Sequence, residues 1–161
     1  MILALYSINN VYMDRILFSR NSDEWSTPND FFNKLDEEYN FVFDLACSKD
    51  NCKTNDGFTI EDDSLKQNWA LITYETGGGW LWINPPYSKC KEFVDKAYSE
   101  MLIGAKIVML IPARTDTKWF HNFIYNKEGV EVKFIKGRLK FGDSINSAPF
   151  PSMLVIFNLV Q

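Results

Sequence analysis

Several residue types and patterns on which common functions depend are scarce in this sequence. It has one histidine, His121, and three cysteines, Cys47, Cys52 and Cys90. An odd number of cysteines without a regular spacing predicts reduced thiols in an intracellular protein. A zinc site made of Cys47, Cys52 and His121 is disfavoured because no Cys-x2-Cys pair is present, so we expect no metal. We interpret His121 as a surface or structural residue rather than a general base.

Long apolar runs and nucleotide-loop motifs are also missing. Residues 1–13 have neither a basic leader nor a long apolar core, and no later run is long enough to cross a bilayer. We therefore expect no signal peptide, no membrane partner and a cytoplasmic location. No G-x-G-x-x-G sequence occurs, which argues against a dinucleotide fingerprint. The three glycines at 77–79 precede Trp80 rather than Lys-Ser, so they predict a turn and not a phosphate loop.

The net charge of −4 hides an uneven distribution along the chain. Residues 20–63 carry four basic and twelve acidic side chains, whereas residues 104–142 carry eight basic and three acidic ones. Such an asymmetry favours a basic half that faces a polyanion, although two solvated faces of opposite charge would look the same. The length of 161 residues and the apolar content of 46% predict one domain with a substantial core.

The most informative stretch is residues 81–88, where a short apolar run ends in Asn84-Pro85-Pro86-Tyr87. The run predicts a buried parallel strand, and the two prolines end it because they cannot continue a ladder. Asn84 and the Pro85 carbonyl offer hydrogen-bond acceptors beside the flat face of Tyr87. This arrangement suits a planar group that carries an NH2, such as adenine, although a simple proline turn is the alternative.

Further strands and helices are predicted around this turn. A helix is expected from Thr27 as N-cap and Pro28 as first helical residue. Asp44 ends a buried strand, where an acid needs a partner such as a cofactor hydroxyl or amino group. The other predicted elements are strands at 41–46, 105–111, 130–134 and 153–159, short strands at 58–60 and 71–74, and helices at 65–69, after Tyr87 and after Thr117. Their order predicts an α/β fold with a mostly parallel sheet and an antiparallel last strand.

Two basic segments complete the set of candidate site residues. Arg114 and Lys118 follow a strand end and suit phosphates or a base edge, with Asp116 placed to orient Arg114. The segment 136–141 interleaves Lys and Arg with apolar residues and is expected to be a hairpin or loop available to a polyanion.

The sequence resembles the small phage-encoded DNA N6-adenine methyltransferases, the Dam-like phage family. The matching stretches run in order over most of the chain. They are Trp25–Pro28, Phe43–Ala46, Asp63–Leu65 with Trp69, Ile83–Ser88, Leu110–Asp116 with Trp119–His121, Phe134–Gly142 and Ala148–Met153. The Asn84 tetrapeptide is shared with other amino-group methylases, whereas the segments around Arg114 and Arg138 are more specific to the phage family.

The resemblance implies a reduced, single-domain, Rossmann-like class I methyltransferase fold that uses S-adenosylmethionine and acts on a flipped adenine in DNA. It implies a methyltransferase domain at 25–161 preceded by an extension at 1–24. By the resemblance, the catalytic residues are Asn84, Pro85, Pro86 and Tyr87. The cofactor-binding residues are Thr27, Pro28, Asp44, Leu45, Ala46 and Asp63, and the substrate-binding residues are Arg114, Asp116, Lys118, Trp119, Arg138 and Lys140.

The chain departs from larger members of the superfamily after its first predicted strand. They have a glycine-rich loop there, whereas this chain has Leu45-Ala46-Cys47-Ser48. Two alternative functions therefore remain open at this point: an RNA or protein-glutamine methylase that shares the Asn84 motif, and a DNA- or cofactor-binding module without catalysis.

Overall fold

A single five-stranded sheet organises the protein. The computed structural model describes residues 25–142 and 144–160, so the predicted extension at 1–24 lies outside the described residues. The strands are β1 (Phe41–Asp44), β2 (Trp80–Ile83), β3 (Ile107–Pro112), β4 (Val130–Phe134) and β5 (Ser152–Phe157). The helices are α2 (Asn29–Tyr39), α3 (Trp69–Glu75), α4 (Cys90–Leu102) and α5 (Lys118–Phe123), with 3-10 turns η1 (Ile60–Asp62), η2 (Ser64–Lys66) and η3 (Tyr87–Lys89).

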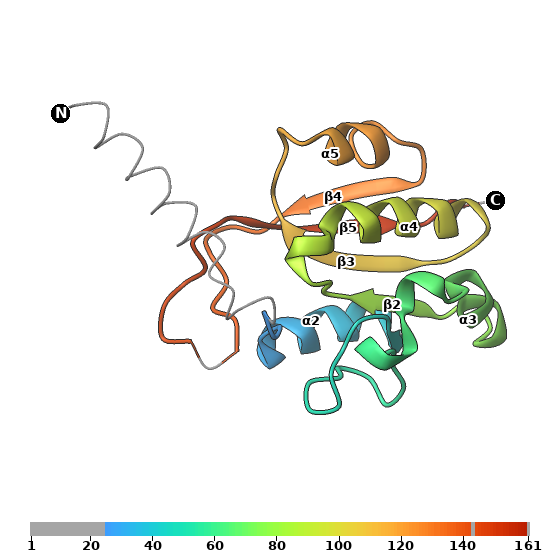
Figure 1. Ribbon diagram of the computed structural model, residues 1–161, viewed down its shortest axis with the longest axis horizontal. Helices are drawn as coiled ribbons and strands as arrows, with labels where there is room; N and C mark the ends of the chain where they lie inside the picture. Colours follow the sequence, from blue (N-terminus) through green and yellow to red (C-terminus); the bar gives the residue numbers. More distant parts are fainter. Residues whose placement is uncertain (1–24, 143, 161) are drawn as a thin grey trace.

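The strand order in the sheet is β1-β2-β3-β5-β4 (Figure 1). β1, β2 and β3 pair in parallel, and β5 pairs antiparallel with both β3 and β4. Only β5 therefore runs against the other strands, as the sequence predicted. The α/β class and the antiparallel last strand are confirmed.

Both faces of the sheet are buried, which explains why β3 and β5 are apolar at nearly every position. One core contains Leu81 and Ile83 of β2 and packs against α3, α4 and α5. The opposite core contains Trp82 and packs against α2 and the segment between β4 and β5. Successive residues of a strand thus point alternately into two cores.

The predicted strand at 71–74 is wrong, because these residues form most of α3. Asn68 caps this helix by accepting a hydrogen bond from the Leu71 backbone N–H at 2.9 Å. Trp69 and Thr73, one helical turn apart, are buried, whereas Tyr74 is exposed. The β-branched residues suggested a strand, but burial of one helical face decided the conformation.

Three other local predictions change in detail. The predicted helix at 65–69 is replaced by the 3-10 turn η2, and α3 begins only at Trp69. The proposed strand at 58–60 is reduced to an isolated bridge between Asp44 and Gly57. The helix α2 begins after Pro28, whose carbonyl accepts the first helical hydrogen bond from Phe32 N–H. Thr27 therefore does not cap α2. At α5 the prediction is confirmed, because the Thr117 hydroxyl accepts a hydrogen bond from the Phe120 N–H at 3.3 Å.

Candidate active site

A cavity of about 730 Å³ opens where β1 and β2 end. The two strands run parallel with Asp44 opposite Trp82, so their carboxyl ends reach the same edge of the sheet. The volume falls in the range of small-molecule sites. The predicted site residues that line the cavity are Thr27, Asp44, Ala46, Asp63, Asn84 and Pro86. Residues from four separate parts of the chain therefore meet there.

Asn84 holds its side-chain amide in a defined orientation. Its Nδ2 donates hydrogen bonds to the backbone carbonyl of Trp25 and to the Thr27 hydroxyl oxygen, the latter at 3.0 Å. Its Oδ1 is buried and has no hydrogen-bond partner. A buried acceptor without a donor is unfavourable in the isolated protein and is the kind of atom that a ligand donor would satisfy.

Tyr87 lies in an aromatic cluster next to Asn84. Its ring is nearly parallel to that of Trp25, at a centroid distance of 6.3 Å and an interplanar angle of 16°. Phe141 and Phe150 contact the Tyr87 ring edge-on, at centroid distances of 6.2 and 5.4 Å. The Tyr87 hydroxyl is buried without a partner, and burial raises the pKa of this phenol well above its ordinary value.

Asp44 is a buried carboxylate that lines the cavity. Oδ1 accepts a hydrogen bond from the Ala46 backbone N–H at 3.2 Å, and Oδ2 accepts one from the Lys53 backbone N–H at 3.0 Å. Burial raises the pKa of Asp44 to about 6, against the opposing effect of the two backbone donors and the Lys53 charge. The carboxylate is therefore held in place by the loop that follows β1.

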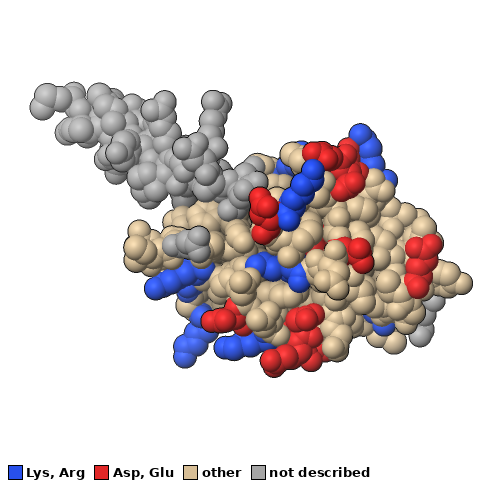
Figure 2. All heavy atoms as spheres, turned by 90° about the horizontal axis from the view of Figure 1, so that it is seen from below, with Lys and Arg blue, Asp and Glu red and all other residues tan. Residues whose placement is uncertain are grey.

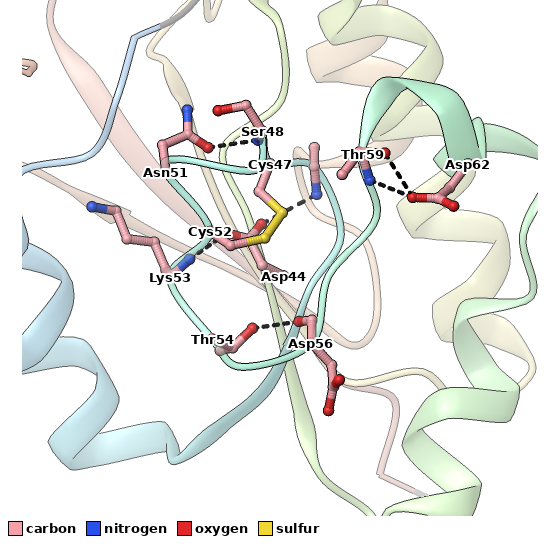
Figure 3. The surroundings of a disulfide bond; sticks show 11 residues. Asp44, Cys47, Ser48, Asn51, Cys52, Lys53, Thr54, Asp56, Thr59 and Asp62 are labelled. Carbon is pink, nitrogen blue, oxygen red and sulfur yellow. Dashed lines mark hydrogen bonds between the residues drawn. A yellow bond between two sulfur atoms is a disulfide. The ribbon is translucent and has the colours of Figure 1, made fainter.

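The loop after β1 carries a disulfide between Cys47 and Cys52 (Figure 3). The expectation of three reduced thiols is wrong for this pair, whereas Cys90 is buried and forms no disulfide. The loop folds back on β1 and brings the two Cα atoms to 4.9 Å, which their spacing in the sequence did not reveal. Gly57 packs against the disulfide, where a Cβ atom would lie 2.7 Å from each sulfur.

Four of the predicted catalytic and cofactor-binding residues do not line the cavity: Pro28, Leu45, Pro85 and Tyr87. Leu45 is fully buried in the core, and its backbone N–H continues the ladder by donating to the Trp82 carbonyl. Pro28 begins α2, and Pro85 is buried in the turn after β2. These residues support the shape of the site through the backbone.

Sequence reasoning missed several residues that the structure brings to the site. Ser64 lines the cavity, and its hydroxyl is buried without a partner, like Asn84 Oδ1. The ring of Trp25, together with Phe141 and Phe150, encloses Tyr87. The position of Trp25 just before Ser26-Thr27-Pro28 was the available indication, but its role depends on contacts between distant segments.

The predicted substrate-binding residues lie outside the cavity. Arg114, Asp116 and Lys118 are exposed after β3, and Trp119 packs partly against the core. Arg138 and Lys140 are exposed in the segment between β4 and β5. None of the six predicted substrate-binding residues therefore lines the cavity.

Backbone contacts bring both basic segments close to the aromatic cluster. The Ala113 N–H donates to the Pro151 carbonyl at 2.9 Å, next to Phe150. Phe141, which follows Lys140, contacts the Tyr87 ring. The segment between β4 and β5 lies on the same side of the sheet as the start of α2 in Figure 1, and the Gly142 N–H donates to the Ser26 carbonyl. The basic residues thus flank the Asn84 turn.

The acidic and basic residues, which are concentrated in different parts of the sequence, are less clearly separated on the surface of the folded protein. On the face shown in Figure 2, acidic side chains (red) lie among basic ones (blue), with several Lys and Arg at its left end. On this face the charges form a mixed surface, because segments of opposite charge pack side by side. Lys133, for example, donates to Glu38 at 3.2 Å although the two residues come from different halves of the chain.

The raised pKa of Asp44 predicts a specific pH dependence of stability. Between about pH 4 and pH 6 the folded protein binds more protons at Asp44 than the unfolded chain, whose ordinary pKa is 3.8. The stabilisation that Asp44 contributes is therefore present at pH 4 and lost as the pH rises through 6, by about 3 kcal/mol at most.

We expect urea unfolding to show that the free energy of unfolding of wild type, relative to that of Asp44→Asn, falls between pH 4 and pH 6. Asp50→Asn, an exposed change in the same loop, should follow wild type; an equal slope in all three proteins would contradict the shift.

An α/β fold with a mixed five-stranded sheet, and with an Asn-Pro-Pro-Tyr turn at a strand end beside a ligand-sized cavity, is consistent with a methyltransferase-like protein. Residues 16–160 match the family profile described as DNA N-6-adenine-methyltransferase (Dam). The chain belongs to this family. Both the predicted family and the predicted function, methylation of the adenine N6 in DNA, are confirmed at this level.

Two phage proteins show the same relationship. The chain is 32% identical over 143 residues to the DNA N-6-adenine-methyltransferase of Haemophilus phage HP1, covering 84% of this chain and 78% of that protein. It is 34% identical over 99 residues to the protein of the same name from Escherichia phage T1, covering 61% of this chain and 39% of that protein. The family match begins at residue 16, inside the segment predicted as an extension.

Among residues 25–142 and 144–160, no helix combines the length and apolar character needed to cross a membrane.

Proposed function

We propose that this protein transfers the methyl group of S-adenosylmethionine to N6 of a flipped adenine in DNA, at the Asn84 turn. The observation that carries this proposal is the buried, unpartnered Oδ1 of Asn84, in the same turn as Tyr87, whose ring stacks against Trp25. An amide oxygen in that position accepts a hydrogen from an amino group, and an aromatic ring binds the face of a base.

The Rossmann-like class I fold is part of the proposal. It is supported by three parallel strands with helices on both faces and by the insertion of β5, antiparallel, between β3 and β4. In open α/β sheets ligands bind outside the carboxyl ends of the strands, where the cavity lies. We assign residues 25–161 to the methyltransferase domain and residues 1–24 to an extension.

The cavity residues fit the chemistry of S-adenosylmethionine, which supplies an electrophilic methyl group on a positively charged sulfur. Asp44 and Asp63 provide carboxylates, and the Ser64 hydroxyl is buried without a partner. Carboxylates and hydroxyls suit the amino and ribose hydroxyl groups of such a cofactor. Thr27 and Ala46 line the same cavity, so four of the six predicted cofactor-binding residues support one bound cofactor.

The reaction requires the chain to hold the adenine amino group in line with the methyl group. A base in a duplex must leave the stack to reach the site. Asn84 Oδ1 and the Pro85 carbonyl accept the two amino hydrogens, which draws electron density onto N6 at the moment of attack. A base stacked between Tyr87 and Trp25 makes a contact of about 3.5 Å on each of its faces, which places the two protein rings about 7 Å apart. Their centroids lie 6.3 Å apart, so Trp25 must shift slightly outward to admit the base.

Removal of a proton from the adenine amino group needs no general base before attack, because the methylated nitrogen becomes positively charged and readily releases a proton. His121, the single histidine, is exposed on α5 and contacts Phe120 and Tyr125. Catalysis therefore depends on positioning and on local dipoles rather than on imidazole chemistry.

The basic residues around the turn are assigned to DNA. Arg114 and Lys118, with Asp116 and Trp119, follow β3, whereas Arg138 and Lys140 precede Phe141. Long cationic side chains next to a base-binding turn suit phosphates of the strand from which the base is flipped. We assign the DNA contacts to these two segments.

Replacing Arg138 and Lys140 together by alanine should weaken DNA binding and its dependence on salt. We expect the slope of log K against log salt to fall by about 1 for each phosphate contact removed. Fluorescence anisotropy with a labelled duplex at several salt concentrations measures this slope. Lys127→Ala, in the connection that enters β4 at the opposite edge of the sheet, is the matched control. An unchanged slope in the double variant would remove this segment from the DNA interface.

The function is tested by label transfer from S-adenosylmethionine to DNA, RNA and protein acceptors. We expect label in DNA, located on adenine N6 by mass spectrometry of the nucleosides. Label in RNA or in protein glutamine, with none in DNA, would select the alternative methylases. Calorimetric titration with S-adenosylmethionine separates these enzymes from a non-catalytic DNA-binding module, for which no cofactor binding is expected.

A further inference from the structure

The amide of Asn84 has two ends of similar size and opposite chemistry. Only the oxygen end accepts a hydrogen bond from an amino group, whereas the NH2 end only donates. A rotation of the amide by half a turn would place a donor against the substrate amino group and prevent the interaction. The reaction proposed above therefore depends on which end of the amide faces the substrate.

The segment that precedes α2 determines this orientation. The backbone carbonyl of Trp25 is an acceptor, so the end of the Asn84 amide that faces it must be NH2. The second amide hydrogen is donated to the Thr27 hydroxyl oxygen at 3.0 Å. Both hydrogens are thus used by protein acceptors, and Oδ1 alone is left buried without a partner.

Thr27 is placed for this contact rather than for a role in the helix. Its side chain is 3% exposed and gives no cap hydrogen bond to α2, which begins after Pro28. The segment is fixed from the other side by the hydrogen bond from Gly142 N–H to the Ser26 carbonyl. The packing of residues 25–28 therefore delivers two acceptors to one end of the Asn84 amide.

We propose that Thr27 is a positioning residue for Asn84: together with the Trp25 carbonyl it locks the amide so that Oδ1 faces the adenine amino group. This inference rests on the proposed function of Asn84. It assigns the Thr27 hydroxyl oxygen to the catalytic amide, in addition to any contact with the cofactor.

The test compares Thr27→Val and Thr27→Ser in steady-state methylation and in cofactor titration. Thr27→Val keeps the shape but removes the acceptor, so we expect kcat to fall about 5- to 10-fold. Because Thr27 also lines the cofactor cavity, the test is the split between the two effects: kcat should fall more than the affinity for S-adenosylmethionine, and Thr27→Ser should retain the wild-type kcat. A loss of cofactor affinity without a change of kcat would overturn the proposal and leave Thr27 as a cofactor ligand.

A second background separates orientation from general structure. In Asn84→Asp the carboxylate has two equivalent oxygens, so it has no orientation to lose. The added Thr27→Val change removes only the hydrogen bond that the hydroxyl can donate to the carboxylate, and kcat should fall less than in the Asn84 background. An equal loss in both backgrounds would show a structural role and contradict the proposal. Wild-type activity in Asn84→Ala would contradict the proposed role of Asn84 in the reaction. Wild-type activity in Thr27→Val, with Asn84→Ala inactive, would contradict only the positioning role of Thr27.

A measurement without turnover completes the test. The side-chain NH2 signals of Asn84, assigned in nuclear magnetic resonance spectra by their loss in Asn84→Asp, report the two hydrogen bonds directly. We expect their exchange with solvent to be slow in wild type and in Thr27→Ser, and faster in Thr27→Val. Equal exchange rates in the three proteins would overturn the proposal even where the Asn84→Asp enzyme is too slow to assay.

Discussion

Replacing Asn84 by alanine is expected to lower kcat for DNA methylation by about 10²- to 10³-fold, the usual effect of removing one preorganised hydrogen-bonding group from a transition state. The change removes the buried Oδ1 acceptor and also the two donated hydrogen bonds to Trp25 and Thr27. Cofactor binding should persist, because Asp44 and Asp63 remain in the cavity wall. Label transfer to DNA and calorimetric titration with S-adenosylmethionine measure the two effects separately.

The matched control for this prediction is Asn84→Asp. It keeps acceptor oxygens at the same position, so it should be more active than Asn84→Ala, although an oxygen then faces the Trp25 carbonyl. A protein with alanine at this position that methylates DNA at the wild-type rate would exclude the proposed role of Asn84.

The second large effect is expected at Tyr87. Replacement by alanine should lower both activity and stability, whereas replacement by phenylalanine should retain both. Tyr87→Ala removes the ring that stacks against Trp25 and contacts Phe141 and Phe150. Loss of base stacking should lower kcat/KM for DNA about 10- to 100-fold, since such stacking contributes about 1–3 kcal/mol. Loss of core contacts should also lower the free energy of unfolding by about 3–5 kcal/mol.

Tyr87→Phe keeps the ring and removes a buried hydroxyl that has no partner. Activity should be retained, and the free energy of unfolding should stay level or rise, because an unsatisfied buried polar group costs about 1–3 kcal/mol. Urea unfolding and kinetics below the melting temperature of the alanine variant test both effects. A large loss of activity in Tyr87→Phe would show that the hydroxyl, and not the ring face, contributes to the reaction.

The loop after β1 does without the glycine-rich sequence of larger methyltransferases. Asp44 instead accepts hydrogen bonds from the Ala46 and Lys53 backbone, and the Cys47–Cys52 disulfide closes the loop between them. Gly57 is required beside the disulfide by close contact and not by a positive φ. A short chain thus shapes the cavity wall with side-chain and backbone contacts in place of a flexible turn.

The local sequence pattern predicted the secondary structure correctly where a segment has only one favourable conformation. Apolar runs buried on both faces predicted β2, β3 and β5, and Pro85 and Pro86 required the turn after β2. The prediction failed at residues 71–74, where β-branched residues in a short segment are compatible with either conformation. Burial of Trp69 and Thr73 against the core then decided for a helix.

The sequence by itself determined the class of the sheet, the position of the Asn84 turn and the family, because these depend on neighbouring residues and on ordered motifs. Only the tertiary structure decided how the turn is used. The Trp25 carbonyl lies 59 positions from Asn84 in the chain, and it sets which end of the Asn84 amide is free. Phe141 and Phe150 enclose Tyr87 from the far end of the chain, and Cys47 reaches Cys52 through a folded loop. Such contacts follow from the packing of whole elements, which no local pattern encodes.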